Sequence, residues 1–184
     1  MSKGKLFVIS GASGVGKSTV LASVMEQRKD LSFSVSATTR DPRPGEKEGI
    51  SYDYVSKETF LDMIEKDEFL EYDVHMDNYY GTPKAQLEEK LRRGHVLLDI
   101  EPNGAFIVRK ARPDATLIFI APPSLEELEK RLRSRGDTPE DQIKLRLERA
   151  AWEMEQGKKY DYYVVNDQVE TCAEKILKII ANAK

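Results

Sequence analysis

The sequence predicts a single α/β domain whose parallel sheet carries a phosphate-binding loop. Two observations indicate this class. Short apolar runs alternate with helical patterns along the 184 residues, and residues 11–18, Gly-Ala-Ser-Gly-Val-Gly-Lys-Ser, fit G-x-x-x-x-G-K-[ST] directly after an apolar run. A chain of this length buries one substantial core, with room for a small inserted lobe but hardly for a second independent domain.

Five apolar runs are predicted strands of the sheet, at residues 5–10, 33–37, 96–100, 116–120 and 162–165. Helices are predicted between them. Residues 18–28 contain neither Gly nor Pro, and Ser124 with Glu127 forms an S-x-x-E capping box before a later helix. Two helices carry apolar stripes expected to pack into the core: Leu125, Leu128 and Leu132, and Ala173, Ile176, Leu177 and Ile180.

Two stretches interrupt this alternation. Residues 36–53 contain two prolines and two glycines, and the loop is too long for a simple connection. It leads into a helical pattern and a short strand near residues 69–74, which predicts a small lobe inserted between strands of the sheet. Residues 133–138, with Gly136 ahead of a Thr138-Pro139 helix start, predict a hinged helical lid.

The glycine-rich motif predicts a nucleoside triphosphate site rather than a chance turn, since a strand precedes it and a helix follows. Gly11, Gly14 and Gly16 allow the backbone to aim successive N–H groups at phosphate oxygens, and Lys17 adds a point charge. The helix N-terminus points at the same phosphates, and Ser18 is placed to bind Mg²⁺. The predicted ATP-binding residues are Gly11, Ala12, Ser13, Gly14, Val15, Gly16, Lys17, Ser18 and Thr19.

Asp99 ends the apolar run Val96-Leu97-Leu98, which is the pattern of a carboxylate that holds Mg²⁺ directly or through water. A helix-capping aspartate is the alternative, and the phosphate loop favours the metal role. A GTPase is disfavoured, because no N-K-x-D is present and the residues after Asp99, Ile-Glu-Pro, depart from D-x-x-G.

The inserted lobe concentrates residues suited to a second substrate. Arginine forks and tyrosine hydroxyls pair with a phosphate monoester, and a carboxylate such as Glu71 can accept the two parallel donors of a guanine edge, which adenine lacks. Hydroxyls can serve the other base atoms. The residues in question are Ser36, Arg40, Arg43, Tyr52, Glu71, Tyr80 and Thr82; taken singly, each fits a solvated loop, and only their grouping favours a site.

These residues belong to a pattern that resembles the guanylate kinase family of P-loop nucleoside monophosphate kinases over essentially the whole chain. The matching segments are Ser34-Val35-Ser36-Ala37-Thr38-Thr39-Arg40, Pro42-Arg43 with Gly45-Glu46, Gly49, Tyr52 and Val55-Ser56, Asn78-Tyr79-Tyr80-Gly81-Thr82, Leu98-Asp99-Ile100, Phe119-Ile120-Ala121-Pro122-Pro123-Ser124, Arg131-Leu132 with Arg135-Gly136, Arg146-Leu147 and Val165-Asn166-Asp167. The long basic loop and the Ile-Ala-Pro-Pro-Ser run are far more specific than the phosphate loop.

The resemblance implies transfer of the ATP γ-phosphoryl group to GMP with Mg²⁺. It also implies a core of residues 1–32, 83–132 and 150–184, a mixed α/β GMP-binding lobe of about 33–82 and a lid of about 133–149. Ser36, Glu71 and Thr82 would bind the base, and Asn166 and Asp167 would lie near adenine. The GMP phosphate would be held by Arg40, Arg43, Tyr52 and Tyr80, with Asp99 close by, and the expected catalytic residues are Lys17, Arg43, Asp99 and the lid arginines Arg135 and Arg146.

The segment after Asp99 departs from the family, which has Gln-Gly where this chain has Asn103-Gly104 after Pro102. Two other functions remain open. One is a non-catalytic guanylate-kinase-like binding module, although such modules typically lose the phosphate loop and carry proline in place of Ser36. The other is a P-loop kinase for a different phosphate acceptor.

Composition excludes several functions. The net charge of −3 gives no field to recruit nucleic acid or an anionic membrane, and no apolar run approaches 18 residues. The single Cys172 excludes an internal disulfide, and the isolated His75 and His95 make no metal cluster. The amino terminus lacks a long apolar segment, so a cytoplasmic location is expected. Oligomeric state leaves no signal in the sequence.

Overall fold

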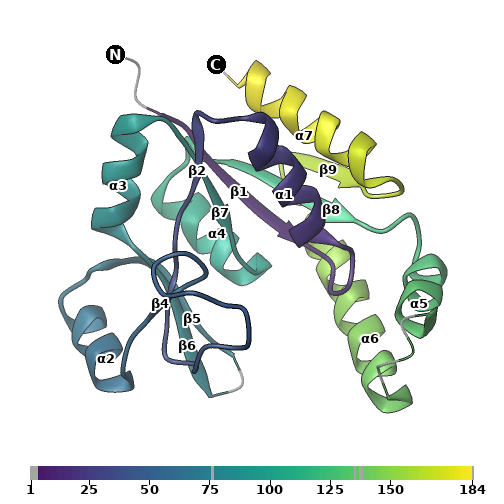
Figure 1. The fold of residues 1–184 in the computed structure, drawn as a ribbon, viewed down its shortest axis with the longest axis horizontal. Coiled ribbons are helices and arrows are strands. Elements are labelled where there is room, and N and C mark those ends of the chain that lie inside the picture. The colour runs from purple at the N-terminus through teal and green to yellow at the C-terminus, as the bar shows by residue number, and fades with distance from the viewer. Residues whose placement is uncertain (1–3, 76, 135, 137–138, 184) are drawn as a thin grey trace.

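The computed structural model describes residues 4–75, 77–134, 136 and 139–183. Its main sheet has five parallel strands in the order β2-β7-β1-β8-β9 (Figure 1). The strands are β1 (Leu6–Gly11), β2 (Leu31–Phe33), β7 (His95–Asp99), β8 (Thr116–Ala121) and β9 (Tyr162–Val165). β1, β7 and β8 are almost fully buried apolar runs, as expected for the central strands of a parallel sheet with helices on both faces.

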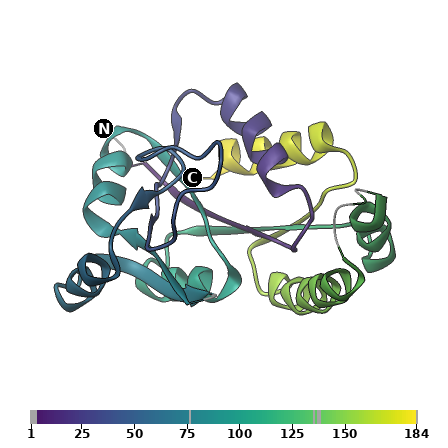
Figure 2. The ribbon, with the colours of Figure 1, turned by 60° about the horizontal axis from the view of Figure 1, so that its bottom comes forward.

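Helices cover both faces of this sheet. In Figure 2, α1 (Lys17–Gln27) and α7 (Val169–Asn182) lie above it, and α4 (Pro102–Ala111) and α6 (Glu140–Gly157) lie below. α3 (Lys84–Arg93) packs beside β7, and α5 (Leu125–Ser134) packs against α6. No helix in the described part of the chain is both long and apolar enough to cross a membrane.

A second, smaller sheet of mixed direction has the order β4-β3-β6-β5. Its strands are β3 (Ala37–Thr38), β4 (Asp53–Tyr54), β5 (Phe69–His75) and β6 (Asn78–Pro83), and α2 (Lys57–Glu65) packs against them. The rings of Phe60 and Phe69 stack with centroids 4.3 Å apart in a separate small core. A Cβ on Gly81 would lie 2.8 Å from the Phe69 ring, so this packing requires glycine.

The small sheet and the helices α5 and α6 are placed around one end of the main sheet. The small sheet with α2 lies beyond the edge of the main sheet where β1 ends, and α5 with the N-terminal part of α6 projects on the other side of that end (Figure 1). The turn from β1 to α1, which contains the phosphate-loop motif, lies at the same edge. Parallel α/β sheets bind ligands at the carboxyl ends of their strands, so a ligand site is expected at this edge.

The predicted parallel sheet flanked by helices is confirmed, and four of its five predicted strands lie within a residue of their observed bounds. The strand predicted at residues 33–37 is wrong. β2 ends at Phe33 and β3 begins at Ala37 in the other sheet, because the partner changes between them: the Ser34 N–H still donates to Leu97 O, while Asp53 N–H donates to Ser36 O. β6, which contains Gly81 and Pro83, was not predicted.

The predicted capping box is half formed. Ser124 Oγ accepts the backbone N–H of Glu127 at 3.1 Å, but the Glu127 carboxylate turns to Arg131 instead of returning to the cap. Around the predicted lid, α5 ends at Ser134 and α6 begins at Glu140. Gly136 between them has a positive φ of 69°, and Thr138 lies outside the described residues.

Candidate active site

The predicted phosphate-binding loop joins β1 to α1 in the strand–loop–helix arrangement that its mechanism requires. Gly14 and Gly16 have φ of 80° and 86°, a left-handed conformation that side chains disfavour. Ala12 N–H donates to Ile120 O at 3.1 Å, which anchors the start of the loop on β8. The loop therefore has a fixed path between two strands and a helix N-terminus.

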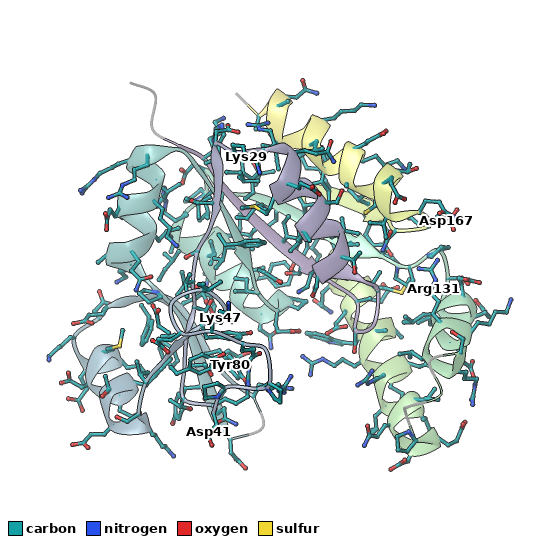
Figure 3. All side chains as sticks on the ribbon, viewed as in Figure 1. Lys29, Asp41, Lys47, Tyr80, Arg131 and Asp167 are labelled. Atoms are coloured by element: carbon teal, nitrogen blue, oxygen red, sulfur yellow. The ribbon has the colours of Figure 1, made fainter. Side chains whose placement is uncertain are left out.

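Two residues outside the motif support the loop. Asn166, buried at the end of β9, donates its side-chain N–H to Val15 O at 2.8 Å, and its Oδ1 atom is buried without a partner. Arg131 of α5 donates to the backbone carbonyls of Asn166 and Asp167, and Figure 3 shows Arg131 and Asp167 side by side. The other support is Glu153, whose carboxylate accepts the N–H of Ser13 at 2.7 Å. The motif gave no sign of Glu153.

Lys17, the first residue of α1, forms a close ion pair with Asp99 at the end of β7. The register explains this, because Ile9 near the end of β1 pairs with Asp99 at the end of β7. Burial lowers the pKa of Lys17, but the charge and hydrogen bond of Asp99, with the charges of Glu101 and Glu153, raise it, and the pKa is raised overall. Lys17 thus stays charged, and it lies against the carboxylate predicted to hold the metal ion.

Glu71 and Thr82 face each other across β5 and β6. Thr82 Oγ1 donates to Glu71 Oε1 at 2.6 Å, and only 6% of Glu71 is exposed. Burial raises the pKa of Glu71 to about 7, against the opposing effect of the Thr82 hydrogen bond. On the other side, Gly104 of α4 lies so close that a Cβ there would be 2.8 Å from Glu71 Oε2. A buried carboxylate with spare acceptor capacity fits a ligand that brings donors.

The predicted phosphate ligands gather in the same lobe. The guanidinium of Arg40 lies 5.4 Å from the centre of the Tyr52 ring, and the rings of Tyr52 and Tyr80 are 6.0 Å apart. Burial raises the pKa of Tyr52, and the charge of Asp99 adds to the rise, which places this cluster within electrostatic reach of the end of β7. Figure 3 shows Tyr80 inside the lobe.

Glu46 is a structural centre of this cluster that the sequence reasoning did not identify. Its carboxylate accepts two hydrogen bonds from Arg40, at 2.9 and 3.0 Å, one from the backbone N–H of Arg43 at 2.7 Å and one from Tyr54 Oη at 2.8 Å. Arg40 above all, and then the Arg43 N–H, lower the pKa of Glu46 to about 2. An acidic residue three positions after Arg43, the second of the two predicted phosphate arginines, was the available signal.

The remaining predicted residues are less closely tied to these clusters. Ser36 lies in the segment between β2 and β3, Arg43 has an exposed side chain, and Arg146 is half-buried on α6. Arg135 lies outside the described residues. The structure therefore brings together three groups: Lys17 with Asp99, Glu71 with Thr82, and Arg40 with Tyr52 and Tyr80.

Comparisons with known proteins agree on one family. A guanylate kinase family model matches residues 3–183. The guanylate kinase of a Thermus thermophilus strain is 48% identical over 179 residues, which cover 97% of this chain and 81% of that protein. That of Clostridioides difficile is 46% identical over 185 residues, covering 100% and 90%. The crystal structure of guanylate kinase from Anaplasma phagocytophilum matches with a TM-score of 0.79 at 36% identity, over 98% of this chain and 86% of that one. The chain belongs to the guanylate kinase family.

Proposed function

We propose that this protein is an ATP:GMP phosphotransferase, which converts ATP and GMP into ADP and GDP. Family membership supports the reaction. The observation that carries the choice of acceptor is the buried Glu71 carboxylate beside Thr82, in the lobe that also contains Arg40, Tyr52 and Tyr80. Guanine offers N1–H and an exocyclic amine side by side to such a carboxylate, and adenine does not.

Phosphoryl transfer from ATP to GMP requires the substrates to be positioned and the phosphate charges to be neutralised, but it does not require a general base. A phosphate monoester with a second pKa near 6 is largely dianionic at neutral pH, so the GMP phosphate is already a nucleophile. We assign Arg40, Arg43, Tyr52 and Tyr80 to hold it. Residues 11–19 would cradle the ATP phosphates with backbone N–H groups other than those of Ala12, Ser13 and Val15, which donate within the protein. Lys17 would exchange part of its contact with Asp99 for the transferring phosphoryl group.

The residues at the loop fit Mg²⁺. Ser18, exposed in the first turn of α1, and Asp99, exposed at the end of β7, offer the hydroxyl and carboxylate oxygens that this ion prefers. Within the described residues, no group of three or more His, Cys, Asp or Glu side chains could hold a metal. When bound, Mg²⁺ would neutralise charge on the phosphate oxygens.

We assign closure over the substrates to the segment at about residues 133–149. Arg146 lies on α6, across the sheet edge from the lobe, and a movement of α6 toward the phosphates would exclude water that otherwise hydrolyses ATP. Arg135 is proposed to act with it. A cytoplasmic location is also proposed, because the proposed substrates ATP and GMP are intracellular nucleotides.

A panel of nucleoside monophosphates tests the proposal. With ATP and Mg²⁺, GMP is expected to give a kcat/KM at least about a hundredfold above AMP and dTMP, since a buried acceptor left without donors costs a few kcal/mol. Coupled detection of ADP measures the rates. Equal turnover of AMP would overturn the acceptor, and binding of GMP without turnover would indicate the non-catalytic module.

Replacing Glu46 tests how the phosphate arginines are held. Glu46→Gln keeps the shape but weakens the fork to Arg40, whose side chain is 13% exposed. We expect KM for GMP to rise about three- to tenfold with kcat changed less than twofold, because an ion pair at this exposure contributes on the order of 1 kcal/mol. Steady-state kinetics at saturating ATP measure the split.

The matched control for Glu46 is Glu48→Gln in the same loop. Glu48 accepts only the backbone N–H of Tyr54, at 3.1 Å, in the described contacts, and a glutamine oxygen can still accept it. KM for GMP should stay at the wild-type value in this variant. Equal effects of the two substitutions would refute a specific role for Glu46.

A further inference from the structure

A chain of three charged side chains connects α6 to the tip of the phosphate-binding loop. Glu153 on α6 accepts the N–H of Ser13 through Oε2 at 2.7 Å, and the Nε–H of Arg149 through Oε1 at 2.9 Å. Arg149 also donates to Glu101 at 3.0 Å, in the segment just after Asp99. One arginine of α6 thus links the loop that would bind ATP and the end of β7.

The burial of Glu153, the middle carboxylate of these contacts, is unusual for a purely structural ion pair. Glu153 is 1% exposed, and a buried carboxylate destabilises the fold unless it is fully paired. An apolar side chain would pack there at lower cost. What the carboxylate adds is an acceptor for the Ser13 N–H, so that this part of the loop is held against α6 by a charge-assisted hydrogen bond.

Charge and burial give a second line of support. Burial raises the pKa of Glu153, and the Ser13 N–H and then Arg149 act against this shift. The Ser13 N–H and Arg149 therefore both favour the charged form of Glu153, which accepts the stronger hydrogen bond, against the effect of burial on its pKa.

We propose that Arg149 and Glu153 are positioning residues that couple α6 to the phosphate-binding loop. Because Arg146 lies one helical turn before Arg149 on the same helix, the coupling makes the conformation of the loop and the placement of Arg146 depend on each other. The inference rests on the proposed function for the identity of the ligand, ATP. It also explains Glu101, in the segment that departs from the family pattern, as an acceptor that helps to hold Arg149 in place.

Arg149→Leu tests the coupling. Leucine keeps the apolar stem of a side chain that is 41% exposed, so the fold should survive, but Glu153 loses its countercharge. We expect the Kd for a non-hydrolysable ATP analogue with Mg²⁺ to rise about three- to tenfold, as for a partly exposed charge-assisted hydrogen bond. The Kd for GMP should not change. Arg149→Lys should recover part of the ATP affinity. Isothermal titration calorimetry measures both ligands.

Arg109→Leu is the matched control. Arg109 on α4 is ion-paired with Asp161, and Asp161 likewise accepts a backbone N–H, that of Leu117 at 2.7 Å, away from the phosphate loop. Arg109→Leu should leave the Kd for the ATP analogue unchanged. The inference fails if Arg149→Leu and Arg109→Leu have the same ATP affinity, or if the Arg149 variant loses affinity for ATP and GMP alike. A wild-type protein that binds ATP but does not phosphorylate GMP would instead overturn the proposed function.

Discussion

Lys17→Ala is expected to lower kcat by at least about two orders of magnitude with the fold intact. The lysine of a phosphate-binding loop contributes mainly to the charge balance of the transition state, and losing one preorganised donor of that kind costs about 3 to 4 kcal/mol. Its neighbour Asp99 is 36% exposed, so water can solvate the carboxylate that loses its partner. Circular dichroism and coupled turnover on the same preparations measure both parts of the expectation.

Lys29→Ala provides the comparison for Lys17. Lys29 is exposed in the turn between α1 and β2, on the same segment of chain but away from the loop (Figure 3). This variant should keep wild-type kcat and the same thermal midpoint. If Lys17→Ala retained a kcat within a fewfold of wild type, the loop would not be binding the reacting phosphates.

Much of the fold follows from local sequence patterns. The central strands are continuous apolar runs bounded by turn residues, and the glycines of the loop need their left-handed angles whatever packs around them. The wrong prediction of one strand at residues 33–37 comes from the same reading of an apolar run as a single strand. Phe33, Val35 and Ala37 alternate as a strand should, but hydrogen bonding across β2 and β3 passes from one sheet to another, and the choice of partner is a tertiary property.

Site residues could be predicted only where a motif or the chemistry of the side chain indicates a single function. Lys17, Asp99 and Glu71 were found by motif or by chemical fit, and they lie in paired, interpretable positions. Glu46 and Glu153 could not be assigned, since their roles consist of contacts with backbone N–H groups that folding brings near. A glutamate on a helix is usually solvated, and nothing in the local sequence distinguishes the buried Glu153.

Glu71→Gln is expected to reduce kcat/KM for GMP about ten- to a hundredfold and to leave ATP affinity unchanged. The substitution puts an NH₂ donor where guanine needs an acceptor, and losing a charge-assisted hydrogen bond costs about 1.5 to 3 kcal/mol. Thr82, 2.6 Å from Oε1, can still donate to the amide oxygen, so the lobe should fold normally. Steady-state kinetics with each substrate varied in turn measure the selectivity of the effect.

The pH dependence of GMP binding provides an independent readout of Glu71. Its pKa of about 7 in the free protein means that the carboxyl is partly protonated at neutral pH, whereas accepting two donors requires the carboxylate. GMP binding should therefore release a proton, and affinity should increase from pH 6 to pH 8 and then level off. The phosphate of free GMP titrates near pH 6 whichever variant is measured, so the informative quantity is the difference in slope between wild type and Glu71→Gln.

Glu68→Gln separates a specific effect from a general loss of charge in the lobe. Glu68 is exposed just before β5, and only its backbone groups bond, to Met63 and Lys84, in the described contacts. Its substitution should change neither kcat/KM for GMP nor the pH slope. If Glu71→Gln kept the wild-type pH slope while losing GMP turnover, the carboxyl would be holding the lobe together through Thr82 rather than meeting the guanine edge. Equal losses for GMP and ATP would point the same way.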